Sequence, residues 1–181
     1  MIPVPDLIDY ISKRYGASDK ISSTMLSYII FLIDWRHAVA TGEPLSNASW
    51  VLTENGPLIP NLFDELTKVD GVALQILPSS YGESSIYIQT RPWLGRFYNG
   101  PLKKKDRSFV DSVLYEVSGL NPNEFLNAVE FAYPILSSNV DESLNLGLLS
   151  TEYKERETWF RNRERTNNQT NSYNNLDPIN H

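Results

Sequence analysis

Few side chains in this sequence could carry out acid–base or metal chemistry. The 181 residues include two histidines, His37 and His181, and no cysteine. Thiolate nucleophiles, disulfides and cysteine-based metal sites are therefore excluded, and imidazole and carboxylate groups remain as the strong metal ligands. His37 stands close to Asp34 and Arg36 in the sequence, where an acid–base role is conceivable. An ordinary histidine at the edge of the core is the favoured interpretation.

The carboxylates do not form a recognisable catalytic pattern either. Asp64 and Glu65 are adjacent, as are Asp141 and Glu142, and neighbouring residues of a helix do not converge on one site as residues three or four apart do. The sequence contains no phosphate-binding loop, dinucleotide-binding glycine motif, serine nucleophile elbow or HExxH motif. It therefore predicts a protein that is not an enzyme and requires no cofactor or metal.

The charge distribution bears on possible partners. There are 16 basic and 22 acidic residues, a net charge of −6. A chain of this charge is not expected to attract nucleic acid in general. Two short basic runs, "KKKDR" at 103–107 and "RNRER" at 161–165, leave a nucleic-acid-binding regulator open as an alternative.

Large aromatic side chains are the stronger indication of function. Aromatic residues are enriched where proteins meet, because they bring a large apolar area and often a polar group at its edge. Those outside clear helical faces, and a pair in an otherwise charged segment, are therefore candidate contacts with a protein partner. The alternative is that the first group only completes a small core. The candidates are Trp50, Tyr81, Tyr87, Trp93, Phe97 and Tyr98, and the pair Trp159 and Phe160.

These residues must be positioned by a mainly helical α+β domain. The apolar spacing predicts a helix at about 6–15. A second helix at about 22–41 has almost no polar face, which predicts a central helix surrounded by protein. Alternating apolar residues predict a strand at 48–53 and a short β-hairpin at about 72–90, joined in one small antiparallel sheet.

The stretch "WVLTENGPLIPNLFDEL", residues 50–66, predicts a rigid corner. A proline is tolerated in the first turn of a helix, where its missing amide proton would have no partner. The strand is therefore expected to be followed by a Gly-Pro turn at Gly56 and Pro57, and then by a helix that Pro60 opens. Its inward-pointing side chains would be Leu62, Phe63 and Leu66.

The second half of the chain predicts further helices. Asp106 is expected to cap a helix that ends at Gly119, and "NPNE" at 121–124 predicts a capping box for a helix that runs to about Tyr133. The segment between them and the hairpin, 91–101, is expected to be irregular. The expected organisation is one globular domain over 1–150, a charged helix over 151–165 and a polar, disordered tail over 166–181.

Nothing in the sequence predicts export or a membrane anchor. The first residues do not resemble a secretion signal. The most apolar stretch, Met25 to Ile33, is too short to span a membrane, which requires about 20 apolar residues. We expect a cytoplasmic protein.

Four blocks of the sequence together resemble the Panacea domain, the SocA-like antitoxin family that is also found in phage-associated proteins. They are "LIDYISKRYG", "ISSTMLSYIIFLIDWRHAVATGEPL", "SWVLTENGPLIPNLFDELTK" and "RSFVDSVLYEVSGLNPNEFLNA", and they span about residues 5–131. In this family a long helix ends near a Gly-x-Pro-Leu phrase, and a later Gly-Pro corner is followed by a second proline. The residues that match are Gly42, Pro44 and Leu45, then Gly56, Pro57 and Pro60.

The resemblance implies a protein that neutralises a cognate toxin by direct binding, without catalysis; some members instead present a toxin to a protease. Two departures concern the surface that meets the partner. The family's Lys-Leu-x-Lys-Leu phrase is replaced by "MLSYI" at 25–29, and no Thr-His phrase follows Leu126. A phage or mobile-element accessory protein that binds a host protease or defence factor is the second hypothesis.

Overall fold

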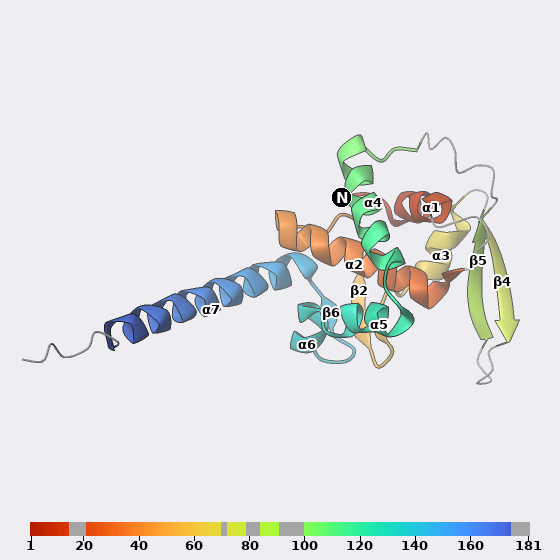
Figure 1. The fold of residues 1–181 in the computed structure, drawn as a ribbon. Coiled ribbons are helices and arrows are strands. Elements are labelled where there is room, and N and C mark those ends of the chain that lie inside the picture. The colour runs from red at the N-terminus through yellow and green to blue at the C-terminus, as the bar shows by residue number, and fades with distance from the viewer. Residues whose placement is uncertain (15–20, 70–71, 79–83, 91–99, 175–181) are drawn as a thin grey trace, which may run out of the picture.

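The computed structural model arranges helices and two small sheets around one central helix (Figure 1). It describes residues 1–14, 21–69, 72–78, 84–90 and 100–174. The helices are Val4–Arg14 (α1), Ser23–Thr41 (α2), Leu62–Thr67 (α3), Lys104–Ser118 (α4), Pro122–Glu130 (α5), Tyr133–Ser137 (α6) and Leu146–Asn174 (α7). The strands are Ile21–Ser22 (β1), Trp50–Thr53 (β2), Gly56–Leu58 (β3), Val72–Pro78 (β4), Ser84–Thr90 (β5) and Ser143–Leu144 (β6).

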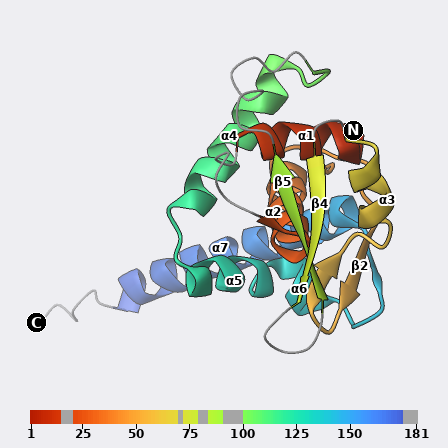
Figure 2. The same cartoon turned by 90° about the vertical axis from the view of Figure 1, so that its right-hand side faces the viewer.

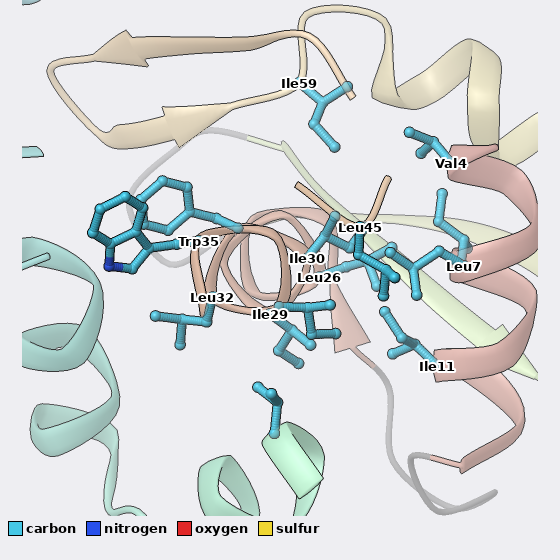
Figure 3. Close-up of a cluster of buried hydrophobic side chains, with 14 of the residues drawn as sticks. Val4, Leu7, Ile11, Leu26, Ile29, Ile30, Leu32, Trp35, Leu45 and Ile59 are labelled. Atoms are coloured by element: carbon cyan, nitrogen blue, oxygen red, sulfur yellow. The ribbon is translucent and has the colours of Figure 1, made fainter. Parts of the chain in front are cut away.

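Helix α2 is the predicted central helix. The Ser22 hydroxyl accepts a hydrogen bond from the Met25 amide at 3.1 Å and so caps its first turn. At the other end Gly42 adopts a left-handed conformation, φ 95°, and its amide donates to the Ala38 carbonyl at 2.7 Å. Figure 3 looks along this helix and shows apolar side chains leaving it on several sides. The absence of a polar face in the sequence is thus explained by burial.

Helix α1 covers one side of the central helix. Its apolar residues Leu7, Ile8 and Ile11 are completely buried, and Figure 3 shows Leu7 and Ile11 pointing towards α2. Each fully buried side chain of this size contributes on the order of 1.5–3 kcal/mol through the apolar surface that it removes from water. The predicted helix at about 6–15 is confirmed, with its start two residues earlier.

The strands form two sheets, and the expectation of one sheet is wrong. The predicted hairpin pairs β4 with β5, and β1 adds to its other edge, with Ile21 opposite Ile88. The predicted strand at 48–53, β2, lies instead between β3 and β6. Because β2 already has a partner on each edge, it has no edge left for the hairpin.

The Gly-Pro corner is a strand rather than a helix start. Pro57 lies in β3, opposite Leu52 of β2, an edge position where a missing amide proton is tolerated. The predicted turn at Gly56 and Pro57 is therefore wrong. Helix α3 begins only at Leu62, with Asn61 at the cap position, so the prediction that Pro60 opens it is also wrong. Leu62 and Leu66 are buried as predicted, whereas Phe63 is 51% exposed, because this helix of six residues presents only one side to the core.

Helices α4 and α5 follow their predicted order with different ends. Asp106 lies in the first turn of α4 and does not cap it; Lys103 occupies the cap position and makes no side-chain cap bond. The predicted capping box of α5 is present between Asn121 and Glu124. This helix ends at Glu130, before the expected Tyr133, and the short α6 follows.

Helix α7 is longer than the predicted charged segment. It begins at Leu146, packs against α2 and α6, and then projects away from the body (Figures 1 and 2). Its helical backbone continues to Asn174, so the first nine residues of the predicted tail are helical here, while 175–181 lie outside the described residues. No helix in the described part of the chain is long and apolar enough to cross a membrane. The segment 91–99 of the predicted irregular region also lies outside it.

Candidate partner-binding surface

A buried carboxylate ties the central helix to the segment that precedes β2. Asp34 is 0% exposed, and its Oδ1 accepts the Ser46 amide at 2.7 Å. Its Oδ2 accepts the Ser46 hydroxyl at 2.6 Å and the Trp50 indole N–H at 3.1 Å. Burial raises the pKa of the Asp34 carboxyl, and the hydrogen bonds from Ser46 and Trp50 oppose that rise. Trp50 is 3% exposed, so this predicted contact residue belongs to the core.

The Gly-Pro corner is fastened to the first half of α2. The Ser27 hydroxyl donates to the Pro57 carbonyl at 3.2 Å, and the Tyr28 hydroxyl donates to the Asn55 carbonyl. Gly56 has φ +100°, and a Cβ placed on it would lie 2.8 Å from the Tyr28 hydroxyl oxygen. Glycine is therefore required at this position both by the backbone conformation and by the closeness of the tyrosine.

Replacement of Gly56 by alanine is expected to lower the free energy of unfolding by about 1–3 kcal/mol, because it adds left-handed strain and a clash with Tyr28. Gly119→Ala is the matched control. Gly119 has a right-handed conformation, and the nearest atom to its added Cβ would be 3.5 Å away. Urea unfolding followed by circular dichroism measures both variants. Equal stability of the two would contradict this account of the corner.

Two adjoining hollows flank Tyr28, and we call them together the Tyr28 groove. The first, of about 390 Å³, is lined mainly by apolar groups of α2, α4 and α5. The second, of about 780 Å³, lies between the β2–β3 turn, the end of α5 and the residues around α6. Thr24 and Tyr28 line both hollows. The groove thus runs along α5, whose lining residues are Pro122, Phe125, Leu126, Val129 and Glu130.

The surface around this groove is acidic. From Ser108 to Tyr153 the sequence contains seven carboxylates and no lysine, arginine or histidine. Two of the seven, Asp111 and Glu116, pair with Arg14 and Arg36. Glu54 and Glu130 line the second hollow. Burial raises the pKa of Tyr28, and the negative charge of Glu130 raises it further. The two carboxylates, Glu54 and Glu130, therefore give this hollow its negative charge.

Exposed apolar side chains continue from the groove. Leu126 on α5 is 40% exposed, and Phe131, directly after α5, is 67% exposed. Leu136 and Val140, in and after α6, are 66% and 50% exposed. Contiguous apolar side chains surrounded by polar groups are characteristic of surfaces that bind other proteins. Sequence reasoning did not select these residues; the available signal was the long stretch without a basic residue.

The predicted aromatic contacts within the described residues lie on three separate elements, β2, β5 and α7. Trp159 and Phe160 on α7 are 54% and 58% exposed, and their rings meet edge to face with centroids 4.9 Å apart. The Arg163 guanidinium lies over the Trp159 ring at 5.1 Å. Tyr87 is partly buried on β5. The other candidates, Tyr81, Trp93, Phe97 and Tyr98, lie outside the described residues.

The other residues considered for catalysis or nucleic-acid binding include His37 and the basic run at 103–107. The Nδ1 atom of His37 lies 2.7 Å from the Glu43 carbonyl oxygen, which requires this nitrogen to carry a proton and donate, and the ring meets Phe109 edge on. Within the described ranges no three histidine, aspartate or glutamate residues are placed to hold a metal ion. The basic run at 103–107 begins α4, with its three lysines exposed.

The comparison with protein families identifies the class of protein to which this fold belongs. The family model described as "Antitoxin SocA-like, Panacea domain" matches residues 26–130. This match covers the central helix, the Gly-Pro corner, the hairpin, α4 and α5, which is more than half of the chain. The chain therefore belongs to the SocA-like Panacea family, as the sequence resemblance indicated. No curated protein and no solved structure gave a significant match.

Proposed function

We propose that this protein is an antitoxin that neutralises a cognate toxin by binding it directly, without catalysis. Membership of the SocA-like antitoxin family is the observation that carries the proposal. The acidic, partly apolar surface around the Tyr28 groove supports it, since exposed apolar groups with a charged rim suit a protein partner. We place this action in the cytoplasm.

Two separate surfaces can contribute to toxin binding. The Tyr28 groove offers concave apolar area with carboxylates at its edge. The exposed Trp159–Phe160 pair stands on the projecting α7, and paired aromatics of this kind often supply a large share of binding energy. Binding at these surfaces neutralises the toxin by covering the residues that the toxin needs for its activity.

Co-expression tests the proposal. A bacterial host that expresses the reading frame adjacent to this gene is expected to stop growing, and co-expression of this protein is expected to restore growth. The two proteins should then co-purify as a stable complex, because neutralisation requires binding. Growth curves and size-exclusion chromatography with light scattering measure the two results.

The control is a destabilised chain expressed at the same level, such as Asp34→Ala at a temperature where it unfolds; it should not restore growth. Toxicity that wild-type protein leaves unchanged would contradict the pairing. A harmless neighbour within a block of phage genes would favour the second candidate, an accessory protein that binds a host protease or defence factor.

A further inference from the structure

We infer that the Tyr28 groove is the docking site for a basic, amphipathic helix of a protein partner. The inference rests on the proposed function for the view that this partner is the toxin, and it adds the site and the chemistry of the contact. The shape, polarity and charge of the groove define the site itself, whichever partner binds there.

The apolar part of the groove fits one face of a helix. Along α5 the lining residues recur at helical spacing, Pro122, then Phe125 and Leu126, then Val129, which places them in one stripe. Phe125 and Val129 are buried and form the floor of the groove, so the exposed Pro122 and Leu126 are the members of the stripe that a partner reaches. This helix of nine residues is about 13 Å long. A partner helix laid beside such a stripe inserts side chains at positions i, i+3, i+4 and i+7. About two turns of partner helix match the length available.

The charge of the groove selects a basic partner. Glu54 and Glu130 line the hollow at the end of α5, and neither belongs to an ion pair of the described residues. Lysine or arginine on the polar side of an incoming helix would face these carboxylates, which speeds encounter and fixes orientation. The same field repels the phosphates of nucleic acid and of anionic lipid.

A foreign partner fits better than this chain itself. Helix α7 projects away from the body (Figures 1 and 2), so its own aromatic pair does not reach the groove. The α7 of a second copy carries basic residues beside Trp159, but residues 1–150 contain 11 basic and 17 acidic residues. Two such bodies repel each other, whereas a basic partner is attracted.

Synthetic peptides test the groove without knowledge of the partner. The probe is a fluorescein-labelled, 18-residue helical peptide with leucine on one face and lysine on the other. One comparison peptide has glutamate in place of lysine, and another has the same composition as the probe with leucine distributed around the helix. Fluorescence anisotropy with the full-length protein measures binding at two salt concentrations.

Matched variants show where the peptide binds. Leu126→Ser with Glu130→Lys changes the groove, and Phe63→Ser with Asp64→Lys makes the same changes at exposed positions of α3. Thr24→Lys is a second groove variant that alters an exposed residue shared by both hollows. Circular dichroism confirms that each chain is folded.

The lysine peptide should bind saturably, and salt should weaken the binding. Either groove variant should lower the affinity at least tenfold, whereas the α3 variant should lower it less than twofold. Equal binding by groove and α3 variants, absence of saturable binding, or equal affinity for the distributed peptide would overturn the inference. A concentration-dependent dimer that the groove variants abolish would also overturn it, by assigning the groove to a second copy. Restored growth in the co-expression assay despite such a failure would leave the proposed function standing.

Discussion

Replacement of Asp34 by alanine is expected to lower the free energy of unfolding by roughly 3 kcal/mol or more. The substitution removes the acceptor for the Ser46 amide, the Ser46 hydroxyl and the Trp50 indole N–H, all of which are then buried without it. A buried donor that loses its partner costs about 1–3 kcal/mol. The shift of the urea unfolding midpoint measures the effect.

Asp64→Ala is the control, since Asp64 is exposed on α3; it should change stability by less than about 0.5 kcal/mol.

Asp34→Asn adds a test of protonation. Burial raises the pKa of Asp34 in the folded protein, so the stability that its protonation adds is full below the unfolded pKa and is lost as the pH rises through the folded pKa. Wild type should therefore gain stability relative to Asp34→Asn as the pH is lowered towards about 4. A difference that does not change with pH would contradict this assignment.

Replacement of Phe31 by alanine is expected to cost about 3–5 kcal/mol. Phe31 is completely buried in the central helix, and its ring meets the Trp50 ring edge on, with centroids 5.5 Å apart. Truncation removes this contact and leaves a cavity that the surrounding helices cannot fully close. Thermal and urea unfolding followed by circular dichroism measure the loss.

Phe160→Ala provides the matched comparison, because it makes the same change at a residue that is 58% exposed. It should leave stability within about 0.5 kcal/mol of wild type and should weaken toxin binding if the aromatic pair contacts the partner. A large loss of stability in this variant would show that α7 docks on the body and is not free for a partner.

The parts of the fold that were predicted correctly depend on local interactions. The capping box of α5 involves residues three apart, Asn121 and Glu124, and its side chains identify a helix start without any distant contact. The length of α2 and its lack of a polar face likewise predicted burial. These features are determined by neighbouring residues, so they are visible in the sequence.

The incorrect predictions concern contacts between distant segments. Strand β2 pairs with β6, so Trp50 lies opposite Leu144, and no local pattern near Trp50 indicates that partner. Pro57 was assigned to a turn before the next helix because Gly-Pro favours turns, yet the hairpin with β2 places it in an edge strand. Tertiary pairing overrides local preference in such cases.

The candidate groove was not predicted for the same reason. Tyr28, Asn55 and Leu126 come from separate parts of the sequence and meet only in the folded chain. The stretch without basic residues was visible in the sequence. The segments that fold next to this stretch could not be identified from the sequence. Trp159 and Phe160 on α7 were selected from the sequence as candidate contacts, since apolar residues in a charged segment stand out locally. The sequence alone leaves open whether they dock on the body or stay exposed.

Because the chain is made from its N-terminus, the packing of α7 on α2 is completed late in translation. Trp35 of the central helix is covered by Tyr133 and Tyr153, and both lie beyond the family match, which ends at residue 130. At ordinary translation rates Tyr153 leaves the ribosome on the order of ten seconds after Trp35. During that interval the nascent chain exposes an aromatic face and an unpaired edge of β2. Trp35 is therefore covered only after most of the chain has been made.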